Sequence, residues 1–360
     1  MKKRILSLAV AACMLTGCSA ADKLLGNKEY EPPEDVTPFN KVELTNYFEG
    51  EEDSLWYQQL REKLTALELE PVLDERVGTS ELKQTFEEMR NDCPEVFWYG
   101  GWSMHPKGDS TRVEVTILQG LEADDLPKMY DELKEAAQEI INEIPSGSSD
   151  YEKALFVHDY IANHCEYDYD SMHEDHMGLW HTSYGALVDH KAVCAGYAEA
   201  FQYLMKLLGI EGGVCSGFSY RGGSHAWNYI KLDGHDYWID VTWDDYEGHD
   251  PGHAYFLFND EQMLRTRWLD AGQNYAPECD SSDVSWYKKN NAYFTEYNED
   301  SISAITSANG GKCDIMFSDF ETYKTALDEL IGKNHMFKLD GVTGSVTYDR
   351  DDRMYVFRIL

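Results

Sequence analysis

The sequence predicts an α+β fold in which a buried helix packs on an antiparallel sheet. Apolar residues recur at helical spacing from Cys194 to Leu208, where a glycine ends the pattern. Asp233 and Gly234 form a residue pair that is preferred in two-residue hairpin turns, and aromatic and β-branched residues flank them on both sides. Three runs of strand-like composition follow the helix, at residues 213–220, 226–232 and 237–243.

Similar patterns on both sides of this region extend the α+β prediction. Helical spacing occurs at residues 51–66, 80–89 and 125–143, and strand-like composition at residues 96–104 and 112–119. A Pro-Ser-Gly stretch at 144–149 interrupts the pattern, and a helix to residue 163 follows with Asp150 as its expected N-cap. The expected C-terminal order is a strand from Cys313, a helix at 320–331, and strands at 344–348 and 354–359.

The first residues have the features of an export signal. Three basic residues at positions 2–4 precede an apolar stretch, residues 5–16, that is too short to span a bilayer. The stretch ends in Leu15-Thr16-Gly17-Cys18, which resembles a bacterial lipobox. The resemblance implies cleavage before Cys18 and a lipid on that cysteine; the alternative is an ordinary cleavage site with a chance cysteine. We expect an extracytoplasmic lipoprotein, anchored to the membrane through Cys18.

These patterns divide the 360 residues into five segments. Prolines and charges without periodicity indicate a tether after the signal peptide, and the break near residue 145 indicates a domain boundary. The expected segments are a signal peptide (1–17), a tether (18–40), an N-terminal α+β module (41–145), a central domain (146–295) and a small C-terminal α+β module (296–360).

The charge of the chain excludes several classes of function. There are 31 basic and 66 acidic side chains, a formal charge of −35, and removal of the three basic residues of the signal peptide makes it −38. This balance argues against non-specific nucleic-acid binding and against a polybasic membrane patch. The field of such an acidic body would favour cationic acceptors, such as lysine side chains. Neither a GxxxxGK[ST] nor a GxGxxG motif occurs, so nucleotide chemistry has no support.

Cys194 is a candidate nucleophile because of its place at the start of the predicted helix. The helix macrodipole and the unpaired N–H groups of the first turn favour the thiolate, and the same N–H groups can stabilise an oxyanion. The alternative is a buried structural cysteine. With Cys13 and Cys18 removed or lipidated, six cysteines remain, and a free nucleophile among them leaves five, which cannot all pair.

The predicted hairpin brings a histidine and an aspartate together. If Leu232 and His235 flank a two-residue turn, His225 and Asp240 become diagonal neighbours on one face of the sheet, within reach of a hydrogen bond. A three-residue turn would place one of them on the opposite face. A histidine oriented by a carboxylate beside a helix-start cysteine is the arrangement of nucleophile, base and orienting group used in covalent catalysis.

Four segments resemble the transglutaminase-like superfamily. They are Val193-Cys194-Ala195-Gly196-Tyr197-Ala198, His225-Ala226-Trp227-Asn228, Asp240-Val241-Thr242-Trp243-Asp244, and residues 149–168. The resemblance covers roughly residues 148–295. It implies a papain-like α+β core that carries a Cys, His, Asp triad in this chain order.

The resemblance implies a role for each matching residue. Cys194 would be the nucleophile, His225 the general base and acid, and Asp240 the group that orients His225. The oxyanion donors would be the Cys194 backbone N–H and one side chain, for which Tyr184 is the candidate; the alternative is a packed aromatic residue. Trp227 and Trp243 flank the triad, either as walls of the site or as core residues.

The resemblance implies an enzyme that transfers acyl groups from protein or peptide amides through a Cys194 thioester, which an amine or water resolves. The alternatives are a cysteine peptidase or amidase of the cell surface, and a non-catalytic binding or scaffold lipoprotein. No cofactor and no metal is expected, since histidines such as His173 and His176 lack a recognised zinc spacing. The expected partners are a protein or peptide substrate at the cell envelope and the membrane, with no nucleic acid.

Overall fold

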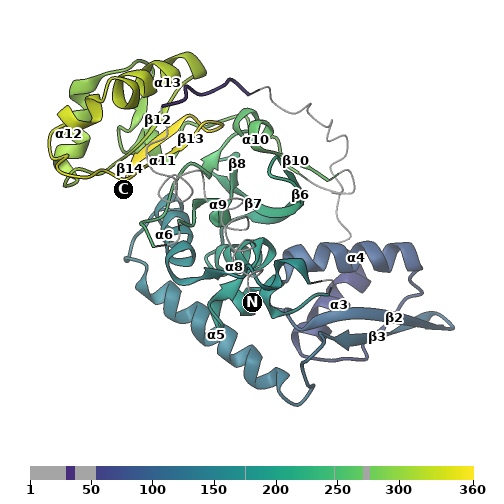
Figure 1. Cartoon of the computed structure of the whole chain (residues 1–360). Helices are drawn as coiled ribbons and strands as arrows, with labels where there is room; N and C mark the ends of the chain where they lie inside the picture. Colours follow the sequence, from purple (N-terminus) through teal and green to yellow (C-terminus); the bar gives the residue numbers. More distant parts are fainter. Residues whose placement is uncertain (1–29, 37–53, 175, 247, 271–275) are drawn as a thin grey trace, which may run out of the picture.

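A computed structural model describes residues 30–36, 54–174, 176–246, 248–270 and 276–360. The predicted signal peptide, Cys18 and most of the predicted tether lie outside the described residues. The division of the chain into five segments therefore stays a prediction. The elements within the described residues form the α+β arrangement that the sequence predicts (Figure 1).

The centre of the molecule is a five-stranded antiparallel sheet in the order β10-β6-β7-β8-β9. Its strands are β6 (Gly212–Ser219), β7 (Ser224–Leu232), β8 (His235–Ile239), β9 (Phe256–Phe258) and β10 (Arg267–Leu269). Helix α8 (Cys194–Leu207) packs on β7 and β6. Around them lie α6 (Asp150–His164), α7 (Ser183–Leu187), α9 (Val241–Asp244), α10 (Asp260–Thr266), α11 (Trp286–Lys289), and the short parallel pair β4 (Glu166–Tyr167) and β5 (Lys191–Ala192).

The β7–β8 hairpin has the predicted register. Asp233 and Gly234 have φ values of +51° and +85°, as a type I′ turn requires, and Leu232 pairs with His235. The expected strand 237–243 is too long, because β8 ends at Ile239. The Asp240 side chain accepts a hydrogen bond from the Trp243 N–H and so caps α9, which replaces the last part of the strand.

The N-terminal part contains three helices and a three-stranded sheet in the order β1-β3-β2. Its elements are α3 (Leu55–Thr65), β1 (Val72–Leu73), α4 (Thr79–Asp92), β2 (Tyr99–Lys107), β3 (Ser110–Ile117) and α5 (Leu126–Glu143). Strand β2 begins three residues later than expected, because residues 93–98 form turns. The N-cap of α6 is Ser149 and not Asp150: the Ser149 hydroxyl and the Glu152 carboxylate form a reciprocal capping box.

The C-terminal part is a four-stranded mixed sheet in the order β11-β12-β14-β13 with two helices. Its elements are β11 (Tyr293–Phe294), α12 (Glu299–Ala308), β12 (Cys313–Phe317), α13 (Phe320–Leu327), β13 (Tyr348–Asp351) and β14 (Val356–Ile359). Strand β13 begins where the expected strand 344–348 ends. The Asp351 carboxylate accepts from the N–H groups of Arg353 and Met354 and fixes the turn between β13 and β14.

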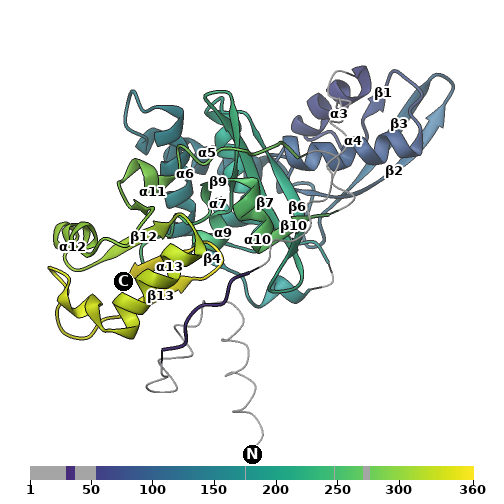
Figure 2. The same ribbon diagram turned by 90° about the horizontal axis from the view of Figure 1, so that it is seen from above.

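Two hydrophobic cores share the central sheet. Ile230 and Leu232 belong to a core that continues into α8 and the N-terminal part, as far as Leu60. Trp227 and Trp238 belong to a second core that continues into the C-terminal part. The sheet is therefore buried on both faces, with the N-terminal and C-terminal parts on different sides of it (Figure 2).

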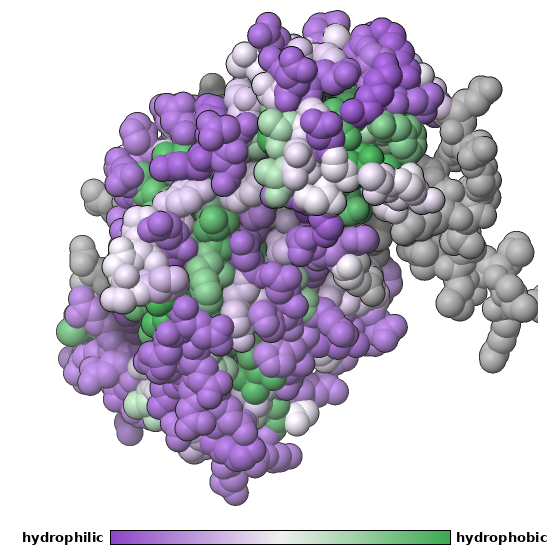
Figure 3. All heavy atoms as spheres, turned by 90° about the vertical axis from the view of Figure 1, so that its left-hand side faces the viewer, coloured by the Kyte–Doolittle hydropathy of each residue, from purple (hydrophilic) through white to green (hydrophobic). Residues whose placement is uncertain are grey.

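Hydrophilic residues cover most of the face shown in Figure 3, and hydrophobic residues appear there mainly in narrow hollows. Within the described ranges, no helix is long and apolar enough to cross a membrane. The six cysteines that the structure describes form no disulfide with one another: Cys93, Cys165, Cys194, Cys215, Cys279 and Cys313. The fold is thus held by its two cores, and no disulfide joins the described residues.

Candidate active site

Cys194 is the first residue of α8, as the sequence predicts. Cys194 as a residue is partly buried, whereas residues 196–205 of the helix are buried. Gly196 is required there, because a Cβ atom at this position would lie 2.8 Å from the Trp180 carbonyl oxygen and 2.7 Å from the Ala192 side chain. The small residues after Cys194 therefore allow the helix start to pack closely against the loop that precedes α7.

His225 and Asp240 form the predicted contact. The His225 Nε2 atom lies 2.6 Å from Asp240 Oδ2, and both side chains are buried. His225 comes from the beginning of β7, and Asp240 from the residue after β8, so the hairpin register positions both. The carboxylate thus fixes the orientation of the imidazole.

The third contact joins Cys194 to His225. Burial opposes ionisation of the Cys194 thiol, but its hydrogen bond with His225 and the charge of that imidazole outweigh burial and lower the pKa of Cys194. Burial likewise opposes the charge on His225, while Asp240 and then Cys194 favour it, and the pKa of His225 is raised. The geometry therefore favours a thiolate–imidazolium pair at neutral pH.

Sequence reasoning missed Arg267, the first residue of β10. This side chain is fully buried, and its Nη1 donates a hydrogen bond to Asp240 Oδ2. Its guanidinium carbon lies 4.1 Å from the ring centroid of Trp243 and 5.0 Å from that of Tyr255. Burial raises the pKa of Asp240, but the charges of Arg267 and His225 lower it to about 2. The only sequence signal was an arginine within an otherwise apolar strand, Arg267-Trp268-Leu269.

Sequence reasoning also missed Tyr167, which lies in β4. Burial raises the pKa of its half-buried side chain, and the nearby backbone N–H of Cys194 opposes that rise. That N–H is the donor expected for an oxyanion. Tyr167 belongs to the Cys165-Glu166-Tyr167-Asp168 stretch at the end of the segment that resembles the family, but its composition does not distinguish it from the neighbouring Tyr169.

The structure does not support the prediction for Tyr184. Its hydroxyl donates to the Glu132 carboxylate at 2.9 Å, and its ring stacks on Phe97 with centroids 4.9 Å apart. Both partners belong to the N-terminal part, so Tyr184 is a packed aromatic residue at an interface. The helical turn Ser183–Leu187 directs it away from Cys194 and toward α5, which a reading by proximity in sequence could not reveal.

The two tryptophans of the prediction differ in their environments. Trp227 is fully buried in the second core. Its ring stacks on that of His225 with centroids 5.9 Å apart and so supports the imidazole from the core side. Trp243 is half-buried, lies 5.2 Å from the His225 ring and is exposed toward Tyr220 and Arg221. Trp243 is therefore a wall of the site, and Trp227 is a core residue.

The histidines considered as metal ligands are not brought together around His173 and His176. Among the described residues, the group with suitably placed donor atoms is His158, Asp159 and His253. Asp159 Oδ1 lies 2.9 Å from His158 Nδ1 and 3.1 Å from His253 Nε2. His158 Nε2 is also 3.2 Å from the buried Asp244 carboxylate at the end of α9. This network of imidazoles and carboxylates holds α9, and with it Asp240, against α6.

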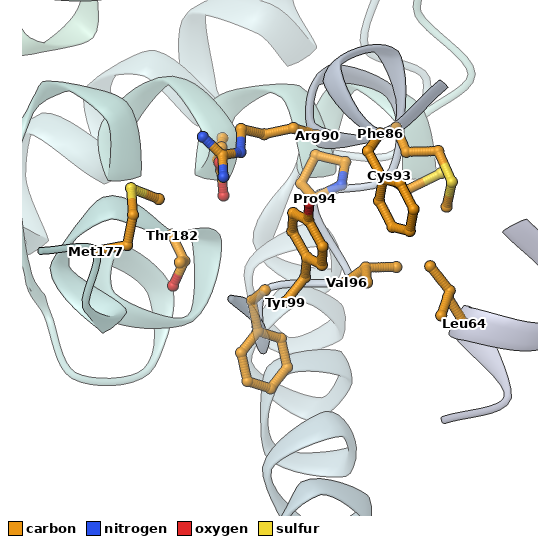
Figure 4. Close-up of a pocket in the computed structure, with 12 residues that line it drawn as sticks. Leu64, Phe86, Arg90, Cys93, Pro94, Val96, Tyr99, Met177 and Thr182 are labelled. Carbon is orange, nitrogen blue, oxygen red and sulfur yellow. The ribbon is translucent and has the colours of Figure 1, made fainter. Parts of the chain in front are cut away.

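A separate pocket lies beside α8, against α4 (Figure 4). Apolar residues such as Phe86 and Val96 line much of it, together with Arg90 and with Glu199 of α8. Glu199 accepts a hydrogen bond from the Ser183 N–H, and burial raises its pKa to about 8. The triad residues do not line this pocket.

Comparisons with known proteins match the part of the chain that contains this site. Residues 135–242 match the model of the Transglutaminase-like superfamily. Kyphoscoliosis peptidase of Mus musculus is 28% identical over 149 residues, which is 38% of this chain and 20% of that protein. The protein of the same name from Homo sapiens is 28% identical over 139 residues, which is 35% of this chain and 21% of that protein. The chain thus spans about one fifth of the length of these curated relatives.

Three solved structures are also similar over part of the chain. A candidate cysteine protease from Cytophaga hutchinsonii covers 40% of this chain and 62% of its own, with 16% identity and a TM-score of 0.26. The match to a structure described as a TGase covers 48% of this chain and 51% of that one, with 14% identity and a TM-score of 0.29. The match to a candidate protease from Parabacteroides distasonis covers 39% of this chain and 35% of that one, with 11% identity and a TM-score of 0.23.

The range matched by the family model begins earlier and ends earlier than the predicted central domain, 146–295. It contains Cys194, His225 and Asp240, and it leaves out Arg267. The matched range also contains α8 and the β6–β7–β8 part of the sheet. The part of the chain that carries Cys194, His225 and Asp240 therefore matches the transglutaminase-like superfamily and has an α+β core.

Proposed function

We propose that the protein is a thiol-dependent enzyme that cleaves amide bonds of proteins or peptides through a thioester on Cys194. The observation that carries the proposal is the continuous contact from Cys194 to His225 to Asp240 at the N-terminus of α8. The pKa of Cys194 is lowered, whereas burial raises the pKa of each of the other five described cysteines. One thiol in the described residues is thus prepared to act as a nucleophile.

The geometry supports a two-step reaction. The Cys194 thiolate attacks the carbonyl carbon of the amide, and the resulting oxyanion accepts a hydrogen bond from the Cys194 N–H. His225 gives its proton to the leaving nitrogen as the C–N bond breaks, which releases the amine and leaves a thioester. Water or a second amine then transfers a proton to His225 and attacks the thioester, and Cys194 leaves as the thiolate.

Tyr167 supplies the second oxyanion donor in this proposal. Its side chain lies beside the Cys194 N–H, where an oxyanion would bind. A small movement of the ring would let the incoming oxygen accept from both the backbone N–H and the phenol. Tyr167 thus takes the role that the sequence suggested for Tyr184.

Transfer to an amine and hydrolysis share every step up to the thioester. Trp243 shields one side of the His225 imidazole and limits the access of water, which supports transfer. The curated relatives are named peptidases, which supports hydrolysis as the second candidate. A scaffold without turnover would have no need of a lowered thiol pKa.

The proposal places the enzyme at the cell envelope, held by lipid on Cys18. The lipobox-like sequence supports this location. Cells that express the chain and receive a labelled fatty acid should transfer the label to the protein, and Cys18→Ser should abolish the labelling. A wild-type protein that stays unlabelled and uncleaved would contradict the anchor while leaving the chemistry untouched.

The chemistry is tested by alkylation of Cys194 with iodoacetamide across a range of pH. The wild-type rate should stay high well below a pH of about 8.5, the ordinary thiol pKa, and His225→Ala should restore the ordinary profile. His235→Ala is the matched control, because His235 is exposed on the same hairpin. Cys194→Ser gives the background from the other thiols. An ordinary profile in the wild type would contradict the proposal.

The type of reaction is tested with glutamine-containing proteins and cell-wall peptides, each with and without a labelled primary amine. Incorporation of the label that is lost in Cys194→Ser indicates transfer. Release of ammonia or of a new N-terminus without incorporation indicates hydrolysis. Absence of both with every substrate class, despite a reactive Cys194, would favour the scaffold alternative.

A further inference from the structure

Arg221 lies at the tip of the β6–β7 hairpin, four residues before His225. The turn continues through Gly222 and Gly223, which both have a φ of +88° and nothing within 4 Å of a hypothetical Cβ. The hairpin folds Arg221 back over the half-buried ring of Trp243. A basic side chain therefore borders the site on the side where Trp243 forms the wall.

The guanidinium of Arg221 is held in place by aromatic groups. Its Nε donates to the Tyr220 hydroxyl at 3.1 Å, and its central carbon lies 4.8 Å from the ring centroid of Trp243. The opposite neighbour of Trp243 is the catalytic imidazole, with centroids 5.2 Å apart. One indole thus separates the guanidinium from His225. Stacking of this kind pre-orders an arginine before it binds a ligand.

Arg221 has no ion-pair partner within the residues that the structure describes, although the chain has 66 acidic and only 31 basic side chains. The acidic group that acts most strongly on it from a neighbouring element, Asp351, is engaged at both oxygens. Its Oδ1 accepts from the Arg353 and Met354 N–H groups, and its Oδ2 from the Tyr255 hydroxyl. Arg353 stacks on Tyr220 and adds a second positive charge on this side.

Arg267 differs from Arg221 in having a carboxylate partner within the protein. Both arginines contact Trp243, but Arg267 is buried and donates to the Asp240 carboxylate. The Arg221 side chain is exposed, and the two terminal nitrogens of its guanidinium make no hydrogen bond with another described residue. A planar fork of this kind binds a carboxylate with two parallel hydrogen bonds.

We propose that Arg221 is a subsite for a carboxylate of the substrate, next to the amide that Cys194 attacks. The inference rests on the proposed function and names its substrate class: peptides or proteins that carry an acidic side chain or a free carboxylate close to the scissile amide. Arg221 acts by positioning the substrate and takes no part in bond making. The local charge at the site is thus opposite in sign to the charge of the whole molecule.

Two alkylating reagents that differ in charge test the subsite without a known substrate. Iodoacetate carries a carboxylate, whereas iodoacetamide is neutral, and both report the same Cys194 thiolate. The ratio of the iodoacetate rate to the iodoacetamide rate should fall about threefold to tenfold in Arg221→Gln at low ionic strength. Arg221→Lys should retain part of the ratio, because it keeps the charge and loses the fork.

Arg112→Gln is the matched control. Arg112 is an exposed arginine of β3 that pairs with Glu70. Its replacement by glutamine changes the net charge by the same amount as Arg221→Gln, at a position distant in sequence from the triad. The ratio of the iodoacetate rate to the iodoacetamide rate in Arg112→Gln should equal the ratio in the wild type. An equal fall of the ratio in Arg221→Gln and Arg112→Gln would overturn the proposal, because the effect would then come from net charge.

Peptide substrates extend the test. Two peptides that differ only by glutamate or glutamine beside the scissile amide should differ in kcat/KM in the wild type, and Arg221→Gln should remove most of the preference through KM. A preference that survives in Arg221→Gln would overturn the subsite. Failure of the subsite is distinguishable from failure of the proposed function: an unreactive Cys194 contradicts both, whereas a reactive Cys194 with an unchanged ratio contradicts the subsite alone.

Discussion

The carboxylate of Asp240 is shared between His225 and Arg267, since its Oδ2 atom accepts a hydrogen bond from each. The buried site therefore contains two cationic groups around one anion whenever His225 is protonated. Arg267 already balances Asp240, and the thiolate of Cys194 balances the imidazolium. This arrangement links the stability of the sheet edge to the chemistry of the triad.

Removal of Arg267 should leave a buried carboxylate without its permanent counter-charge. We expect Arg267→Met to lower the free energy of unfolding by about 3–5 kcal/mol, as measured by urea denaturation at neutral pH. The double variant Arg267→Met/Asp240→Asn should recover a substantial part of this loss, because it leaves no unpaired charge. Additive losses in the double variant would show that Arg267 acts through packing against the aromatic rings alone.

Tyr167 and Tyr184 form a matched pair of tyrosines that separates an oxyanion donor from a packed residue. Tyr167→Phe should reduce kcat by about 100-fold to 1,000-fold, because one donor to the oxyanion is lost, and should leave the pH profile of alkylation nearly unchanged. Tyr184→Phe should retain kcat and lose about 1 kcal/mol of stability with the hydrogen bond to Glu132. Equal kinetic effects in the two variants would rule out the assignment of Tyr167.

Glu199 should make stability depend on pH. Its pKa is raised by burial to about 8, above the ordinary value for glutamate, so its favourable contribution is complete below a pH of about 4.5 and is lost as the pH rises through 8. Glu199→Gln removes this titration. Its stability relative to the wild type should therefore increase with pH across this window, by at most about 1.4 kcal/mol per pH unit.

Denaturant unfolding of both proteins at pH 5 and pH 8 measures this effect. Glu211→Gln is the control, because Glu211 is an exposed glutamate that pairs with Lys231. The same difference between pH 5 and pH 8 in the wild type and in Glu199→Gln would contradict the assignment.

The C-terminal part should be indispensable for folding. Trp227 and Trp238 on one face of the central sheet are buried by residues of the C-terminal part, and Tyr255 donates to Asp351. A chain that ends at residue 295 would expose this face, and we expect it to show no cooperative unfolding transition. A truncated chain with a cooperative transition and a reactive Cys194 would show that the second core is separable.

The sequence was sufficient for the features that depend on local rules. The Asp233-Gly234 turn determines the register of β7 and β8, and that register alone predicts the contact of His225 with Asp240. The start of α8 at Cys194 follows from helical spacing and small residues. Ser149 was missed as N-cap although the Ser-x-x-Glu spacing of a capping box was visible.

The rest of the site depends on contacts between residues that are distant along the chain. Arg267 reaches Asp240 only because β10 pairs with β6, and nothing in the strand's composition specifies that edge. Tyr167 reaches Cys194 through the pairing of β4 with β5, two strands of two residues each. Tyr184 was misassigned because proximity in sequence does not define the direction of a side chain on a short helix.

The segment at residues 30–36 is attached to the opposite end of the chain. The Tyr30 hydroxyl donates to Asp328 at 2.7 Å, and Arg350 donates to the Glu31 carbonyl at 3.0 Å. A mechanical pull on the N-terminal end, such as a lipid on Cys18 would transmit, is therefore borne first by the C-terminal part. The force would act on the part of the molecule that contributes the second core, which contains Trp227, the residue that stacks on His225. Tension on a lipid at Cys18 would in this way act on the same core that positions the His225 imidazole.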